Sequence, residues 1–281
     1  MSHFQLIKRK TFLGFKTPGI MGILNITPDS FSDGDIYYSK PTKAIQAAIK
    51  MVKMGADIID IGAESTRPGA RLIKPEIEIK RLRPILKGLK RKNIKISVDT
   101  RNSLTMRFAL EEGAQIINDV SALNHDSESI NVIKFSKCFV ILMHMQGSPE
   151  TMQDNPQYVD LLAEISEFLN QSITIAATAG IDPDKIAIDP GIGFGKTDSH
   201  NLLILKNLCR LQELGKPVLL GVSRKSLIGN ILNVSVDERL EGSLSAAVFG
   251  VIQGASIIRT HDVQATRRAI KVAESIMNEK G

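Results

Sequence analysis

Polar side chains end several short apolar runs of this sequence, and the first group of them suits a flat heterocycle. Asp99, Asn118 and Asp189 supply two carboxylates and an amide. Such groups accept hydrogen bonds, and the amide also donates, which suits a ring with several N–H groups and ring nitrogens. Met143 and Phe194 can form the apolar walls of such a pocket, although Met143 alone is more typical of core packing. We call these residues the acceptor set.

A second group is cationic or polar and suits phosphate or carboxylate oxygens. It contains Arg67, Lys225, Arg259 and His261. Arg259 and His261 are two positions apart, so extended backbone places both on one face. Asn25 could bind Mg²⁺ that is already held by phosphate oxygens, although one amide is equally typical of a structural role. Together the two groups predict a heterocycle that carries an anionic leaving group.

Other chemistries find less support in the sequence. No serine or cysteine has a base at a spacing typical of a nucleophile, and no H-E-x-x-H motif or close cysteine pair predicts zinc. Cys138 and Cys209 both lie in apolar surroundings, which indicates buried thiols in a reducing compartment. Covalent catalysis and zinc hydrolysis are therefore disfavoured.

The stretch from Asp189 to Lys196 reads D-P-G-I-G-F-G-K and follows a short apolar run. Glycine at every second position suits backbone that turns or approaches another group closely. The spacing matches neither the dinucleotide fingerprint nor the Walker motif. Two interpretations remain, a tight turn with a capping aspartate or a backbone that runs beside a flat ligand.

Eight apolar runs alternate with helical periodicity and predict the elements that position these groups. The expected strands are residues 20–26, 57–62, 94–99, 115–120, 139–144, 185–189, 217–222 and 256–259. The expected helices are residues 42–54, 75–91, 103–112, 127–135, 156–179, 200–214, 237–253 and 263–278. This alternation predicts an eight-stranded parallel β/α (TIM) barrel, with an open doubly wound sheet as the alternative. In a barrel, the carboxyl ends of the strands share one mouth.

The sequence predicts a single domain over residues 1–281. Residues 1–17 are expected to form a short N-terminal β-hairpin, whose two strands lie within residues 3–16. Two connections, residues 27–40 and 63–74, are longer than usual and predict lids or binding loops, or else flexible surface loops. The apolar stripe Leu244, Ala247, Val248 and Val251 permits a subunit contact but is more often core.

Composition indicates a cytoplasmic protein with anionic ligands. The net charge is +6 and the isoelectric point about 9.2, but the basic residues are dispersed, so we expect no nucleic-acid partner. No apolar run approaches the roughly 18 residues of a membrane span, and we expect no membrane partner.

Several motifs, in order, resemble the dihydropteroate synthase family of folate biosynthesis. They are M-G-I-L-N-I-T-P-D-S-F-S-D-G from residue 21, D-I-G-A-E-S-T-R-P-G from residue 60, S-V-D from 97, I-N-D-V from 117, M-H-M from 143, the glycine-rich stretch, S-R-K-S from 223 and R-T-H-D-V from 259. The resemblance runs from residue 21 to the last helix. It implies a barrel transferase that joins 4-aminobenzoate to a dihydropterin diphosphate and releases diphosphate and 7,8-dihydropteroate, by an SN1-like route.

The resemblance also implies roles for individual residues. The dihydropterin would be bound by Asp99, Asn118, Met143, Asp189, Phe194, Gly221 and Lys225. Diphosphate would be bound by Asn25, Thr66, Arg67, Arg259 and His261, with Mg²⁺ at Asn25. The aminobenzoate would lie near Phe31, Thr66, Pro68, Phe194 and Ser226. Catalysis would fall to Asp189, Lys225 and Arg259, in a homodimer.

Two positions depart from the family's usual pattern, Asp35 in place of a glycine and Thr260 in place of a valine. Two rivals remain: a corrinoid-linked methyltetrahydrofolate methyltransferase and a pterin-binding barrel without activity. The first has no need of diphosphate-binding cations or of the S-T-R-P-G loop. The second would bind the pterin without turnover.

Overall fold

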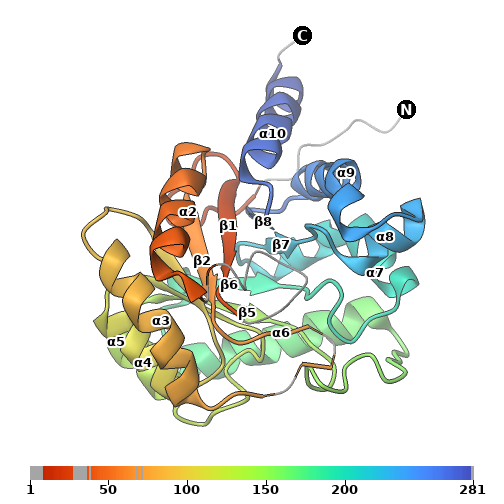
Figure 1. Ribbon diagram of the computed structural model, residues 1–281. Coiled ribbons are helices and arrows are strands. Elements are labelled where there is room, and N and C mark those ends of the chain that lie inside the picture. Colours follow the sequence, from red (N-terminus) through yellow and green to blue (C-terminus); the bar gives the residue numbers. More distant parts are fainter. Residues whose placement is uncertain (1–8, 28–36, 38, 68, 71, 280–281) are drawn as a thin grey trace, which may run out of the picture.

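The computed structural model describes residues 9–27, 37, 39–67, 69–70 and 72–279. Its strands form one parallel sheet in the order β6-β5-β4-β3-β2-β1-β8-β7 (Figure 1). They are β1 Gly19–Asn25, β2 Ile58–Gly62, β3 Ile96–Asp99, β4 Ile116–Asp119, β5 Phe139–Met143, β6 Ile186–Asp189, β7 Leu219–Gly221 and β8 Ile257–Thr260. An isolated parallel bridge between Ile188 and Val218 joins β6 to β7 and closes the ring. The predicted β/α barrel is confirmed, and the open sheet is excluded.

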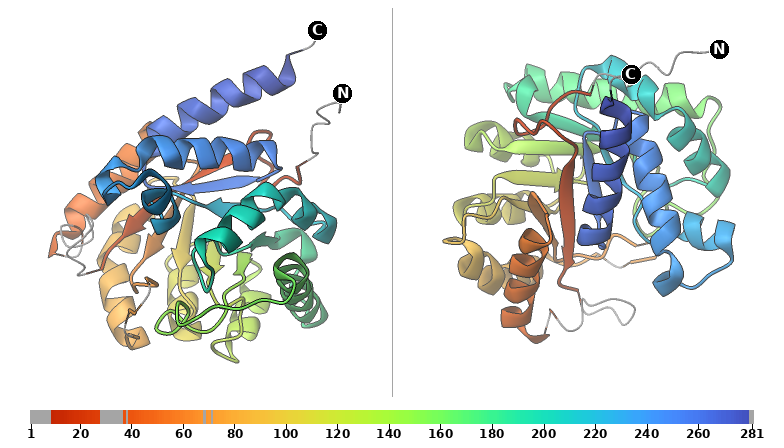
Figure 2. Two further views of the ribbon diagram at one scale, coloured as in Figure 1. Left: turned by 90° about the vertical axis from the view of Figure 1, so that its right-hand side faces the viewer. Right: turned by 90° about the horizontal axis from the view of Figure 1, so that it is seen from above.

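Helices surround the sheet, α2 to α5 on one side and α7 to α9 on the other (Figures 1 and 2). Their bounds are α2 Pro41–Lys53, α3 Pro75–Leu89, α4 Ser103–Glu111, α5 Ser129–Ser136, α6 Leu161–Thr178, α7 Asp198–Lys206, α8 Ser226–Leu232, α9 Leu240–Ile252 and α10 Val263–Asn278. Short 3-10 turns cover Pro183–Lys185, Leu208–Leu214 and Val236–Glu238. Because helices cover the outside, the strands are apolar on both faces.

Side-chain alternation along each strand divides the core in two. On β2, Ile59 and Ile61 point outward and pack with the helices in the larger cluster. Ile58 points inward and packs with residues from the other strands in a smaller cluster inside the barrel. Asp60 and Gly62 have the same parity as Ile58, so they also face the barrel axis. The same alternation sets which polar residues reach the mouth.

The N-terminal segment differs from its prediction. Residues 9–18 form turns and bends and no strand, so the expected hairpin is wrong for this part, and residues 1–8 lie outside the described residues. Phe12 explains the difference, because its ring is 1% exposed and packs edge-on against Phe139, with the centroids 5.3 Å apart. It joins the inner cluster at the amino ends of the strands and covers that end of the barrel.

Two helix predictions also need correction. Helix α6 begins at Leu161 rather than near residue 156, because the Asp160 side chain accepts a hydrogen bond from the backbone N–H of Ala163 at 3.1 Å and caps the helix. The additional helix α8 follows β7, where the sequence predicted only a connection. In the described part of the chain, no helix is long and apolar enough to cross a membrane.

Candidate active site at the carboxyl ends of the strands

Strand register brings most of the predicted site residues into one ring. Asn25 lies beside Gly62, Gly62 beside Asp99, and Asp99 beside Asn118. Across the barrel, Met143 lies beside Asp189, and Gly221 beside Arg259. All of these positions face inward at or next to the carboxyl ends of their strands. The structure thus assembles both chemical sets at the predicted mouth.

Arg259 is clasped between two buried carboxylates. Its Nε donates to Asp60 Oδ2 at 2.7 Å and its Nη2 to Asp99 Oδ2 at 2.9 Å. Asn118 Nδ2 donates to the same Asp60 oxygen at 3.2 Å. Burial by itself would lower the pKa of Arg259, but Asp60 and Asp99 together raise it above its ordinary value. The guanidinium is therefore a fixed positive charge in the mouth.

Each of these two carboxylates, Asp60 and Asp99, has one oxygen that accepts no hydrogen bond within the described residues. Among the described residues, Asp60 Oδ1 and Asp99 Oδ1 are buried and have no hydrogen-bond partner. Burial raises the pKa of Asp99 to about 7, although Arg259 acts against the shift. Buried polar atoms are rarely left unsatisfied, so these oxygens indicate that a ligand or water donates to them. Asp60 was missed by the sequence reading, although its inward parity in an apolar strand could have revealed it.

Asp189 and Lys225 face each other on the other side of the mouth. Asp189 Oδ1 accepts from the N–H of Gly191 at 2.7 Å, and burial raises the pKa of its carboxyl. Lys225 Nζ donates to the carbonyl of Ile192 and lies 4.5 Å from the centroid of the Phe194 ring. Burial lowers the pKa of Lys225 to about 8, while Asp189 opposes that shift.

The glycine-rich loop owes its glycines to contacts with protein backbone. At φ +69°, a Cβ atom on Gly191 would lie 1.9 Å from the carbonyl oxygen of His144. On Gly195, at φ +62°, it would lie 2.6 Å from the carbonyl oxygen of Gln146. Only glycine fits such positions. The loop is therefore a tight turn that packs against the segment that follows β5. In this position the loop presents Asp189 and Phe194 to the mouth.

His261 and Ser223 form a pair at the ends of β8 and β7. Ser223 Oγ lies 3.1 Å from His261 Nδ1 and accepts from the His261 N–H at 3.1 Å. Burial, followed by the charges of Arg259, Arg224 and Arg67, lowers the pKa of His261 to about 3. Without an anion present, the imidazole is therefore neutral above that pH and can donate one hydrogen bond.

Three further predicted residues lie in or directly after the loops at the mouth. Thr66 is half-buried, Arg67 and Ser226 are exposed, and Phe31 and Pro68 lie outside the described residues. The loop after β2 reaches across the rim, since the N–H of Gly69 donates to the carbonyl of Pro149 at 3.0 Å. It is therefore joined to the loop that follows β5.

His144 follows β5 but does not belong to the mouth. It comes one residue after the inward-facing Met143, so its side chain points to the outside of the barrel. There it is 5% exposed and packs edge-on against Phe168 of α6, with the ring centroids 5.0 Å apart.

The comparisons with known proteins agree with this geometry. A family model described as pterin binding enzyme matches residues 21–261. The dihydropteroate synthase of Escherichia coli strain K12 is 43% identical over 277 residues, which cover 98% of this chain and 98% of that protein. The chain belongs to the dihydropteroate synthase family. Its relatives make it an enzyme of the transferase class.

Solved structures of dihydropteroate synthases share the fold over almost the whole chain. The Yersinia pestis enzyme, solved in a complex with a sulfonamide drug, has a TM-score of 0.91 and 39% identity, covering 97% of this chain and 100% of that one. The Xanthomonas albilineans enzyme, solved with 4-aminobenzoic acid, has a TM-score of 0.87 and 40% identity, covering 94% and 95%.

Of the two departures from the family pattern, one is explained. Thr260 is 2% exposed, and its Oγ1 lies 3.0 Å from Thr266 Oγ1 and accepts from the N–H of Asp262 at 3.1 Å. Its hydroxyl thus ties the end of β8 to the start of α10, on the side facing away from the mouth. Asp35 lies outside the described residues.

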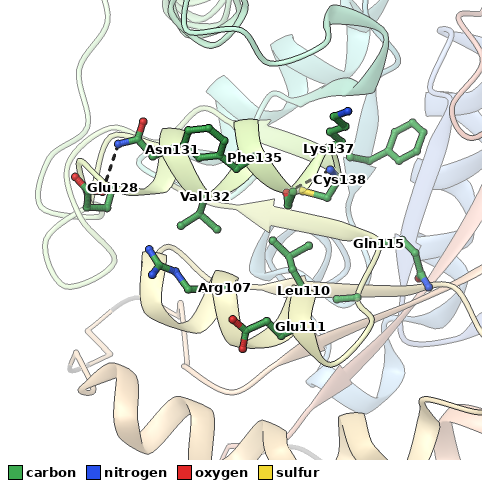
Figure 3. A pocket seen from close by; sticks show the side chains of 13 residues that line it. Arg107, Leu110, Glu111, Gln115, Glu128, Asn131, Val132, Phe135, Lys137 and Cys138 are labelled. Carbon is green, nitrogen blue, oxygen red and sulfur yellow. Dashed lines mark hydrogen bonds between the residues drawn. The ribbon is translucent and has the colours of Figure 1, made fainter.

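A second hollow lies away from the mouth, between α4 and α5 (Figure 3). Its volume is about 950 Å³, and Leu110, Val132, Phe135 and Cys138 are among its lining residues. It opens at the outer side of β5, near Phe139 at the amino end of that strand. Neither chemical set of the mouth contributes to it.

A buried ion pair anchors the loop that carries Thr66 and Arg67. Arg101 Nε and Nη2 donate to the Glu64 carboxylate at 3.1 and 3.3 Å, and both side chains are buried. Glu64 Oε1 also accepts from the N–H of Ile73 at 3.2 Å, near the far end of the loop. The pair therefore ties both ends of this loop to the residue that follows β3.

Replacing Arg101 by methionine is expected to lower the free energy of unfolding by about 3–5 kcal/mol, because the buried Glu64 carboxylate would lose its counter-ion. Urea denaturation measures this change. The exposed Arg268→Met on α10 is the matched control and should change stability by less than about 0.5 kcal/mol. Equal midpoints for the two variants would show that the buried pair does not anchor the loop.

Proposed function

We propose that this chain condenses (7,8-dihydropterin-6-yl)methyl diphosphate with 4-aminobenzoate to give 7,8-dihydropteroate and diphosphate, a step of folate biosynthesis. The observation that supports the proposal is that hydrogen-bond acceptors and a cation lie together in one mouth. Within the described residues, one carboxylate oxygen each of Asp60 and Asp99 lacks a hydrogen-bond partner, and both carboxylates form ion pairs with the half-buried Arg259. A heterocycle that is rich in N–H groups can donate to these oxygens, and an anion attached to it can pair with the guanidinium.

The pterin would lie among Asp99, Asn118, Asp189 and Lys225. Asp189 retains one carboxylate oxygen beyond the one that Gly191 uses, and Asn118 retains its amide carbonyl. These acceptors suit the amino group and ring N–H of a pterin, while the Lys225 ammonium suits its carbonyl oxygen. Met143, which is 3% exposed, and Gly221 would form walls, with Phe194 at the outer edge.

The diphosphate would lie on the Arg259 side, in reach of Arg67, Thr66, His261 and Asn25. Burial and nearby arginines lower the pKa of His261, and an anion bound beside the imidazole would raise that pKa and favour its protonation. The charges of Arg259 and Arg67 are present beforehand. They stabilise the negative charge that develops on the departing diphosphate.

The site fits Mg²⁺ only as a partner of the diphosphate. A Cβ atom on Gly62 would lie 3.3 Å from Asn25 Oδ1 and 3.9 Å from Asp99 Oδ2, so both oxygens reach the space over this glycine. Within the described ranges, no three His, Cys, Asp or Glu side chains are placed to hold a metal. Asn25 would bind Mg²⁺ that keeps most of its waters, and the ion would neutralise diphosphate charge.

The reaction would proceed by an SN1-like route. The bond between the pterin methylene and the diphosphate oxygen breaks first, and its electron pair leaves with the diphosphate. The Asp189 carboxylate stabilises the pterin cation that remains. The amine nitrogen of 4-aminobenzoate then attacks the methylene and releases a proton to solvent. A neutral aromatic amine is already nucleophilic, so no strong base is needed in the mouth.

The 4-aminobenzoate would lie above the pterin, near Phe194, Thr66 and the exposed Ser226 at the start of α8. Phe31 and Pro68 complete this subsite by resemblance to the family alone. The loop after β2, tied to Pro149, would help exclude water from the reactive cation. Because sulfonamides share the aniline group, we expect them to compete with 4-aminobenzoate.

The assay for this function supplies purified protein with both substrates and Mg²⁺. We expect 7,8-dihydropteroate and diphosphate in a one-to-one ratio, with sustained release of diphosphate only when 4-aminobenzoate is present. Bound pterin without dihydropteroate would instead favour a pterin-binding barrel that has no activity.

The pH profile tests the role of Lys225. Its pKa of about 8 means that the ammonium is present below pH 8 and is lost as the pH rises through that value. We therefore expect kcat/KM for the pterin diphosphate to fall above about pH 8, since this ratio reports the free enzyme. In Lys225→Arg the falling limb should move beyond pH 10, because guanidinium stays protonated. A limb that stays at pH 8 in this variant would assign it to another group.

We further propose a homodimer in the cytoplasm and a single domain over residues 1–281. Ala247 and Val251 are 3% and 2% exposed, so two of the four residues of the apolar stripe singled out in α9 belong to the core. Exposed apolar side chains nearby offer a better contact, namely Leu202, Ile231, Leu232 and Phe249. Light scattering on the purified protein tests this, and a monomer at micromolar concentration would contradict it. Both cysteines are free thiols, which suits a reducing compartment.

A further inference from the structure

Lys196 is a buried lysine for which the proposed reaction has no direct use. It is 3% exposed, although lysine is rarely buried without a partner. Its Nζ lies 2.9 Å from His144 Nδ1, and it donates to the carbonyls of Phe194 at 2.9 Å and of His144 at 3.4 Å. Within the described ranges, no carboxylate forms an ion pair with it. Three acceptors therefore surround Lys196 Nζ, which suits the three N–H donors of an ammonium. Burial lowers the pKa of Lys196 to about 7, so the ammonium is present below that pH.

His144 is a neutral partner in this cluster. Burial, and next the charge of Lys196, lowers the pKa of its imidazole to about 3. Its ring packs against Phe168 and Tyr158, with centroids 5.0 and 6.1 Å away, and His200 packs edge-on against Tyr158. His144 Nδ1 can thus act as a fixed acceptor on the outside of the barrel, at the end of β5.

The cluster lies on the opposite side of the glycine-rich loop from the mouth. Lys196 holds the Phe194 carbonyl, while the Phe194 ring lies under Lys225 Nζ at 4.5 Å. The same loop carries the Ile192 carbonyl, which accepts from Lys225. Asp189 is held separately, by the N–H of Gly191. A shift of residues 192–196 would therefore move Phe194 more than Asp189.

Other hydrogen bonds also hold this loop: the N–H of Phe194 donates to the Gly191 carbonyl at 3.1 Å, and the N–H of Gly193 donates to Asn201 Oδ1 at 2.8 Å. Tyr158 donates its hydroxyl to the Gly195 carbonyl at 2.7 Å, and Gln153 donates to the Gly193 carbonyl at 3.0 Å. Within the described residues, only Lys196 contacts both the Phe194 carbonyl and His144, the residue that follows β5, with one group. Gly191 allows that close approach, since any side chain there would meet the His144 carbonyl.

We propose that Lys196 is a positioning residue, whose buried amino group fastens the glycine-rich loop to the end of β5 and thereby holds Phe194 in place for the aminobenzoate. The proposal rests on the proposed function, because Phe194 is taken as a wall of that subsite. It assigns Lys196 no contact with substrate. It predicts a specific pattern of kinetic loss, which a general loss of folded protein would not give.

The test compares Lys196→Met with Lys206→Met, an exposed lysine on α7. Methionine keeps the length of the side chain but leaves three buried acceptors without their donor. We expect Lys196→Met to raise KM for 4-aminobenzoate at least fivefold and to lower kcat/KM at least tenfold. The dissociation constant of 6-hydroxymethylpterin, measured by calorimetry, should change less than threefold because Asp189 stays in place. Lys206→Met should match the wild type throughout.

Two outcomes would overturn the inference. The first is unchanged KM for 4-aminobenzoate in a folded Lys196→Met variant, and the second is a loss of kcat alone, which indicates only a smaller folded fraction. If Lys196→Met fails to fold, the variant His144→Leu tests the proposal instead. This substitution removes one acceptor of Lys196 and leaves its two contacts with backbone carbonyls. We then expect an approximately threefold rise in the same KM, and no rise would overturn the proposal. Failure of the proposed function is distinguished by a wild-type protein that makes no dihydropteroate.

Discussion

Replacing Asp189 by asparagine is expected to lower kcat about 10²- to 10³-fold while the protein remains folded. The carboxylate lies at the end of β6 and keeps one oxygen free beyond the N–H of Gly191. Asparagine has nearly the same shape, but it cannot stabilise a positive charge on the pterin ring. Loss of one such preorganised electrostatic contact typically lowers the rate by this amount.

Two measurements separate this effect from a structural one. Asp184→Asn changes an exposed aspartate near the amino end of the same strand and should leave kcat unchanged. In Asp189→Asn, the pKa of Lys225 should also fall further, because Asp189 now acts to raise it. The falling limb of the pH profile should therefore move below pH 8. A near-wild-type rate in Asp189→Asn would remove its role in the reaction.

Replacing Arg259 by methionine is expected to abolish turnover and to lower the free energy of unfolding by about 3–5 kcal/mol. The guanidinium is the shared partner of Asp60 and Asp99, which are 0% and 9% exposed. Its removal leaves two buried carboxylates close together without a counter-ion. It also removes the principal cation at the departing diphosphate.

A second substitution separates stability from chemistry. Adding Asp60→Asn to Arg259→Met removes one of the unpaired charges, so urea denaturation should show part of the stability restored. Activity should stay absent, because no cation returns to the mouth. The exposed Arg268→Met serves again as the control. Recovery of turnover in the double variant would mean that Arg259 acts only through the fold.

The fold was predictable because each strand-plus-helix unit repeats the same sequence pattern. Eight apolar runs separated by amphipathic helices leave few arrangements other than a barrel. The site followed from the rule that carboxyl ends of parallel strands converge, and Asp99, Asn118, Asp189 and Arg259 all lie in the predicted ring. The same rule misses Asp60, because it considers only the last residue of each strand. Asp60 lies one inward-facing position deeper in β2.

Contacts that depend on tertiary packing could not be predicted. Phe12 lies in a segment whose spacing resembles a hairpin, yet burial of one aromatic ring at the barrel floor decides its conformation. Lys196 follows a glycine loop that resembles an anion site, and only the fold shows that it turns toward His144. The neutral state of His261 is likewise a product of burial and of neighbouring arginines.

The central claim is that the mouth ionises the pterin diphosphate before the amine attacks. Positional isotope exchange tests it most directly. The substrate carries ¹⁸O in the oxygen between the methylene and the phosphorus, and benzoate, which lacks the amine, fills the aminobenzoate subsite. If the bond breaks first, the released diphosphate can rotate and recombine, so recovered substrate should carry the label in non-bridging positions. Substrate that keeps all of its label in the bridge, from enzyme that is active with 4-aminobenzoate, would contradict the claim.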